Sequence, residues 1–134
     1  MTPERFEHYK LNISSIDDAH WDLLQQMVTL KNLANNGGIE EALSMMGDLY
    51  DRFDKHFIEE EQYMADINYP YINGHVTAHR LFRATILRVT DHKSKYSAIP
   101  RWRINELIEE FVKHIDYFDI QIANFVKATA KKAA

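Results

Sequence analysis

The stretch "HFIEEEQYM", residues 56–64, places a histidine and a glutamate four positions apart in a segment with helical spacing. Side chains four apart lie on one face of an α-helix, so His56 and Glu60 are neighbours. Such pairs are common wherever a helix faces water, and a surface pair is the ordinary interpretation. The other interpretation is half of a metal-binding site, and the rest of the chain decides between the two.

Length and composition limit the class of protein. The chain has 134 residues, the size of one domain, and 46% of them are hydrophobic, enough for a core. Cysteine is absent, which excludes disulfides, thiolate zinc sites and iron–sulfur clusters and leaves histidine and carboxylates as metal ligands. The net charge is −4 without a basic stripe, so nucleic acid is not an expected partner. We expect no membrane span and no signal peptide, and therefore a cytoplasmic location.

Turn signals divide the chain into four long segments. They are "NNGG" (35–38), "INYPYING" (67–74) and "KSKYSAIP" (93–100). Within the segments, hydrophobic residues recur at intervals of three and four, as in helices that bury one face, and no strand-like alternation is present. Short connections between long helices imply antiparallel neighbours. The predicted fold is all-α: an up-down-up-down antiparallel four-helix bundle in a single domain, residues 1–134, with an N-terminal arm over 1–14 and the bundle over about 15–130.

Polar residues interrupt the apolar faces of all four segments. They are His20, His56, Glu60, His75, His79 and His114. A lone histidine on such a face is usually a core residue with a hydrogen-bond partner. Each buried polar group without a partner costs roughly 1–3 kcal/mol, and several would consume a domain stability of about 5–15 kcal/mol. Because all six fall near one end of an antiparallel bundle, we expect them to converge on a shared cation. The histidine–glutamate pair of the opening stretch is then part of a site.

Four motifs, in order, resemble those of hemerythrins, and of bacterial hemerythrins in particular. They are "IDDAHWDLL" (16–24), "HFIEEEQYM" (56–64), "HVTAH" (75–79) and "HIDYFD" (114–119). The resemblance covers nearly the whole chain. It implies a four-helix bundle whose core holds a non-heme diiron centre that binds dioxygen reversibly, for oxygen storage, delivery or sensing.

The resemblance also implies a complete set of iron ligands. The matching residues are His20, His56, Glu60, His75, His79, His114 and Asp119. One iron would be bound by His75, His79 and His114, and the other by His20 and His56. Glu60 and Asp119 would bridge the two iron ions together with an oxide or hydroxide. The two-histidine iron then keeps one open position, where O2 can bind.

Asp119 is the one ligand that the helical spacing does not identify. The apolar stripe of the fourth segment contains Leu107, Phe111, His114, Phe118, Ile122 and Phe125. Asp119 lies five residues after His114, roughly 140° away on an ideal helix. The two can converge only if the helix is locally wider, as in a π-turn, or ends near Asp119.

Other functions could use the same ligands. A purely structural metal site would only link the four helices. A diiron oxidase or peroxidase, or an iron-handling protein, is a stronger alternative, but carboxylate-rich diiron proteins use Glu-x-x-His pairs that the matched ligands here lack. We therefore predict a non-enzymatic oxygen-binding protein, with weak oxidase or peroxidase activity left open, and with an unidentified protein partner that receives oxygen as a further possibility.

Among the positions that depart from the bacterial hemerythrin pattern, two precede the fourth-helix histidine. Many members have Trp and Leu four and three residues before the fourth-helix histidine, where this chain has Glu110 and Phe111. The acidic run "NELIEE" favours a surface position for Glu110. In the other interpretation its carboxylate reaches the diiron pocket, where it could bind the open iron position or relay protons. Both departures leave the ligands unchanged and concern the shape and dryness of the O2 pocket.

Overall fold

The computed structural model describes residues 2–35, 39–96 and 99–133, and within these residues every regular element is a helix. The elements are α1 (Pro3–Glu7), α2 (Ser14–Asn35), α3 (Ile39–Asp66), α4 (Ile72–Tyr96), α5 (Arg101–His114), the π-helix η1 (Ile115–Asp119) and α6 (Ile120–Ala133). None of the helices in these ranges is long and apolar enough to cross a membrane.

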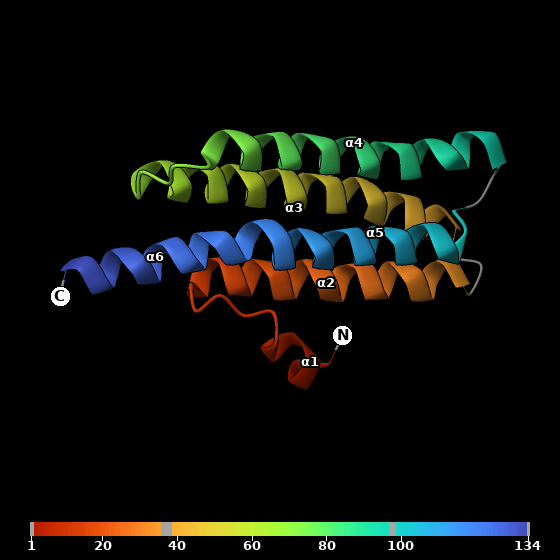
Figure 1. The fold of residues 1–134 in the computed structure, drawn as a ribbon. Coiled ribbons are helices and arrows are strands. Elements are labelled where there is room, and N and C mark those ends of the chain that lie inside the picture. Colours follow the sequence, from red (N-terminus) through yellow and green to blue (C-terminus); the bar gives the residue numbers. More distant parts are fainter. Residues whose placement is uncertain (1, 36–38, 97–98, 134) are drawn as a thin grey trace.

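The helices form four long rods that lie side by side (Figure 1). Three of them are α2, α3 and α4, and the fourth is the continuous run of α5, η1 and α6. Each rod packs on the next, and α5 also packs on α2, which closes the bundle. The chain direction alternates from rod to rod, so the predicted up-down-up-down antiparallel four-helix bundle is confirmed.

Two of the three predicted turns differ in extent from the structure. The segment 67–74 turns around Asn68, which has a φ of 57°, but α4 already begins at Ile72. The turn signal over 93–100 overlaps a helix, since α4 continues to Tyr96. Positions 36–38 of the first turn and 97–98 of the third lie outside the described residues. The sequence pattern did not predict the short helix α1, where the Thr2 hydroxyl accepts a hydrogen bond from the Arg5 backbone and Pro3 is the first residue of the helix.

The apolar core has a large part and two small parts. The large part fills most of the bundle and includes four phenylalanines whose rings contact one another, the phenylalanine cluster: Phe53, Phe57, Phe82 and Phe111. The small parts lie farther toward the start of α2 and the end of α3, and include Ile16, Met64 and Ile122. Between these apolar regions, along each rod, stand the polar residues that sequence analysis selected. The fold therefore places one polar layer between two apolar layers.

The fourth rod contains the π-turn that the spacing of His114 and Asp119 required. The segment Ile115–Asp119 is π-helical, and both His114 and Asp119 are buried. The wider turn brings two side chains five residues apart onto the same inner face. Phe118 and Phe125, which helical spacing places on the buried stripe, are only partly buried, because the π-turn, which contains Phe118, shifts the buried face.

Asp17 fixes the chain where it enters α2. Its carboxylate accepts hydrogen bonds from the backbone nitrogens of Leu11, at 2.8 Å, and Asn12, at 3.0 Å. Asn12 has a φ of 62°, in the left-handed region. Asp17 itself is 7% exposed. The buried carboxylate of Asp17, three residues before His20, thus accepts from two backbone donors of the preceding loop.

Replacing Asp17 by Ala should lower the free energy of unfolding by about 2–3 kcal/mol, because two backbone donors lose a charged acceptor. Urea denaturation of the metal-free protein measures the change. The exposed neighbour Asp18 offers a matched control, and Asp18→Ala should stay within about 0.5 kcal/mol of the unchanged chain. Equal stability of the two variants would contradict this role of Asp17.

Candidate metal centre

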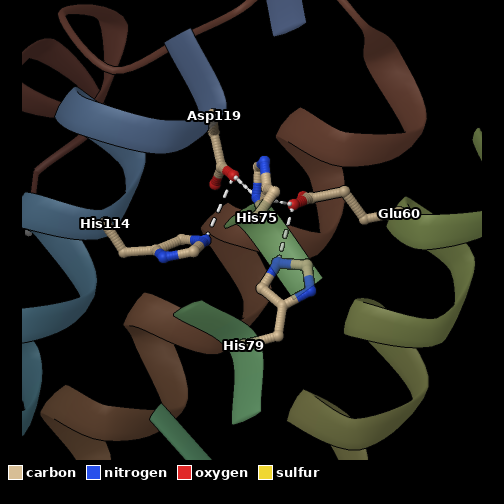
Figure 2. A group of neighbouring side chains, drawn as sticks. All are labelled: Glu60, His75, His79, His114 and Asp119. Carbon is tan, nitrogen blue, oxygen red and sulfur yellow. Dashed lines mark hydrogen bonds and ion pairs between the residues drawn. The ribbon is translucent and has the colours of Figure 1, made fainter. Parts of the chain in front are cut away.

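The structure brings all seven predicted ligands together in one buried layer. Each rod contributes: His20 from α2, His56 and Glu60 from α3, His75 and His79 from α4, and His114 and Asp119 from the two ends of the π-turn. The most exposed of them, His114, is 6% exposed. Figure 2 shows five of these side chains pointing toward one another from three rods.

The nitrogen and oxygen atoms of this layer form two groups that share Glu60. In the first group, Glu60, His75, His79, His114 and Asp119 each offer one atom, and these atoms lie within 4.8 Å of one another. In the second group the same holds for His20, His56 and Glu60. Each group could hold one metal ion.

Glu60 divides its two oxygens between the groups. Its Oε1 lies 2.9 Å from His75 Nε2 and 3.0 Å from His79 Nε2. Its Oε2 lies 3.1 Å from His56 Nε2 and 3.6 Å from His20 Nε2. One oxygen therefore faces the three-histidine group, and the other faces the two-histidine group.

Asp119 divides its oxygens in the same way. Its Oδ1 lies 2.8 Å from His75 Nε2 and 3.2 Å from His114 Nε2, in the three-histidine group. Its Oδ2 lies 3.1 Å from His20 Nε2, in the two-histidine group. Both carboxylates thus have the arrangement of a bridge between two ions.

Most of these close atoms are not arranged as hydrogen bonds. Buried atoms without a hydrogen-bond partner of suitable geometry include Nε2 of His20, His56, His75 and His114, Oε2 of Glu60 and both carboxylate oxygens of Asp119. Native proteins leave few buried polar atoms in this state, and a bound ion would satisfy all of these atoms together. The donor set of imidazole nitrogens and carboxylate oxygens fits such ions, and imidazole suits iron.

The charges of the layer are strongly coupled. Burial disfavours a charged ring at His20 and His75, but the carboxylates of Asp119 and Glu60 outweigh it and raise the pKa of each histidine to about 9. Burial also disfavours the charged carboxylates, yet the surrounding histidines lower the pKa of both Glu60 and Asp119. In the metal-free protein, protonated histidines therefore balance the carboxylate charge.

His79 behaves differently from His20 and His75. Burial lowers its pKa, and the nearby carboxylates of Glu60 and Glu61 do not compensate. A neutral imidazole is the form that binds metal ions.

Apolar side chains pack against one side of the two-histidine group. The ring of Phe111 is fully buried and stands edge-on to the ring of His20, with 5.4 Å between the centroids. Phe53 packs in turn on Phe111, at 4.8 Å. Glu110 is exposed, as the acidic run predicted, and belongs to neither ligand group. It lies on an outer groove of about 710 Å³ that is also lined by His114.

The chain is similar to known proteins along most of its length. The family model described as "Hemerythrin HHE cation binding domain" matches residues 11–119. The chain is similar to the bacteriohemerythrins of three Campylobacter jejuni strains, of serotypes O:23/36, O:6 and O:2. It is 27% identical to each over 125 residues, which cover 91% of this chain and 93% of each relative. No solved structure matches significantly. With a buried layer of metal-binding side chains and a family match over most of its length, the chain belongs to the hemerythrin family.

Proposed function

We propose that the chain binds two iron ions in the buried layer and, through them, binds dioxygen reversibly. The observation that carries the proposal is the division of the carboxylate oxygens, because Glu60 and Asp119 each face both histidine groups. A carboxylate in this position can bind two ions at once. The seven side chains His20, His56, Glu60, His75, His79, His114 and Asp119 are the proposed ligands.

The difference between the two groups supports binding of a small ligand. Both carboxylates serve both groups, but one group has three imidazoles and the other has two. The two-histidine group offers one imidazole fewer, so an ion held there would have fewer protein ligands and would leave room for a small ligand. Two bound ferrous ions would supply the electrons that dioxygen takes up on binding. The curated relatives are named bacteriohemerythrins, which agrees with this chemistry.

The protein's own residues would favour reversible binding over oxidation. Two buried carboxylates would offset part of the charge of the ions, and the ligands come from all four rods and are buried. Phe111 and Phe53 keep water away from the side of His20. We therefore propose an oxygen-binding protein rather than an enzyme. If the protein instead oxidises a substrate or iron, the following experiment would detect it as an absorbance change that does not reverse.

Anaerobic addition of ferrous iron should load two iron ions per chain. Alternating O2 and inert gas should then produce and remove the same absorbance bands over several cycles. Metal analysis and absorbance spectroscopy measure the two quantities. A single tightly bound zinc without iron uptake would contradict the diiron proposal, and bands that never reverse would favour an oxidase or peroxidase.

Two histidine variants provide the comparison for iron loading. His79→Ala should lower the iron content and the melting temperature of the loaded protein, because the neighbouring ligands lose their shared ion. His8→Ala should change neither, since His8 is exposed and belongs to neither group.

The metal-free and iron-loaded proteins should respond to pH in opposite directions. Without metal, His20 and His75 have a pKa of about 9 in the folded chain and about 6.5 when unfolded. Their contribution to stability is fully present below pH of about 6.5 and is lost as the pH rises through about 9. In the loaded protein, protons compete with iron, so acidification releases it. Melting temperatures between about pH 5 and 9.5 test both trends, and identical profiles would refute the exchange of protons for metal.

Phe111 and Glu110 allow a matched test of the pocket, because both can be changed to Leu. Phe111→Leu should speed oxidation of the loaded protein in air, since it opens space beside His20, and should cost roughly 1–2 kcal/mol of stability. Glu110→Leu should leave the oxidation rate and the iron content unchanged, because Glu110 is exposed. The decay of the reversible absorbance change gives the rate. A slower decay in Glu110→Leu alone would show that this carboxylate reaches the ions.

A further inference from the structure

A carboxylate outside the ligand groups contacts His79. The Nδ1 atom of His79 lies 2.7 Å from Oε2 of Glu61, while its Nε2 faces Glu60 across 3.0 Å. An ionised carboxylate only accepts hydrogen bonds, and with an ion bound at Nε2 the hydrogen of the neutral ring would lie on Nδ1, which would donate it to Glu61. In the neutral ring, Nε2 then carries the lone pair and points into the three-histidine group. Glu61 thus selects the form of His79 that can bind a metal ion.

Arg83 lies beside Glu61 and is itself hydrogen-bonded to Asp54. The Nη1 atom of Arg83 lies 4.0 Å from Oε2 of Glu61, and its Nε donates a hydrogen bond of 2.9 Å to Oδ1 of Asp54. Asp54 and Glu61 stand on α3, whereas Arg83 stands on α4 one turn after His79. A pair of ions that is partly buried and linked to a third charge holds its geometry better than an isolated surface pair.

Stacking fixes the plane of the His79 ring. The ring of Phe57 lies parallel to it, with 4.0 Å between centroids and 13° between planes. The guanidinium of Arg83 lies 5.2 Å from the centroid of the Phe57 ring. His79 is therefore held at its face by Phe57 and at its outer nitrogen by Glu61, and Arg83 contacts both of these neighbours.

This arrangement distinguishes His79 from the other proposed ligands. The Nδ1 atoms of His20 and His75 are buried without a hydrogen-bond partner. Across the described residues, Glu61 forms the one ion pair that involves Nδ1 of a histidine in the two groups, since the other pairs involve Nε2. The two groups thus differ in their surroundings as well as in their number of histidines.

We infer that Glu61 is a positioning residue, which acts on the metal through His79. As a result, the ion of the three-histidine group is bound more tightly and oxidised more easily than the ion of the two-histidine group. A carboxylate that accepts the Nδ1 hydrogen increases the electron density at Nε2 and strengthens its bond to a cation. The effect favours the ferric over the ferrous state, because the higher charge gains more. The inference rests on the proposed iron loading of the site.

Glu61→Gln tests this role without removing the hydrogen-bond acceptor. The amide oxygen can still accept from Nδ1, so the variant removes the charge and keeps the shape. Glu59→Gln is the matched control, because Glu59 is on the same helix, is 64% exposed and pairs only weakly with Lys55 at 4.0 Å. Arg83→Met, which removes the positive charge beside Glu61, is a second variant and should act in the same direction with a smaller effect.

The readout is release of iron from the loaded protein to a ferrous chelator, together with the midpoint potential. In Glu61→Gln, one of the two irons should be released about 10- to 100-fold faster, and the midpoint potential should rise. Glu59→Gln should match the unchanged chain in both. Melting of the metal-free proteins should be alike, since a merely structural contact between α3 and α4 would instead lower this melting temperature and leave the potential unchanged.

Two results would overturn the inference. One is equal iron release from Glu61→Gln and Glu59→Gln, and the other is a potential that does not move. If the unchanged chain takes up no iron, the proposed function fails, and the comparison of release rates is then made with Co²⁺ as the probe. A chain that binds neither ion overturns both proposals.

Discussion

Two carboxylates buried among five histidines are the constraint on which the rest of this structure depends. Glu60 and Asp119 are at most 1% exposed, and a carboxylate at that depth is very unfavourable unless positive charge surrounds it. The histidines of the four rods surround the carboxylates. They provide positive charge as protonated imidazoles, or they bind metal ions that provide it. The same layer would therefore hold the bundle together with or without ions, but with different partners for the carboxylates.

The apolar layers on either side make this polar layer possible. The phenylalanine cluster closes one side of it, and the smaller groups that contain Ile16 and Met64 close the other. Water is thereby kept from the carboxylates, which strengthens every electrostatic interaction between them and the histidines. Packing and chemistry are coupled here, since the side chains that stabilise the fold also set the environment of the site.

Much of the site could be predicted from helical spacing, because six of the seven residues interrupt apolar stripes. Asp119 could not be found in this way and required the hemerythrin resemblance, since a π-turn breaks the α-helical period between it and His114. Glu61 was missed for another reason. It stands in the run "EEE", which resembles a solvated surface, and its contact with His79 depends on how α3 and α4 approach each other. Spacing within one helix contains no information about that approach.

The π-turn changes the helical phase of the fourth rod, so the residues after it face a different direction than α-helical spacing predicts. One residue of an α-helix corresponds to roughly 100° of rotation, so the extra residue in the turn rotates everything that follows it. Before the turn, Leu107 and Phe111 face the core. From the turn onward Asp119 and Ala123 are also buried, each one residue beyond the stripe positions Phe118 and Ile122, and Ile122 stays buried beside them. The effect of a substitution in α6 therefore depends on this shifted phase. The stability of the fold is more sensitive to substitution at the buried Ile122 and Ala123 than at the partly buried Phe125.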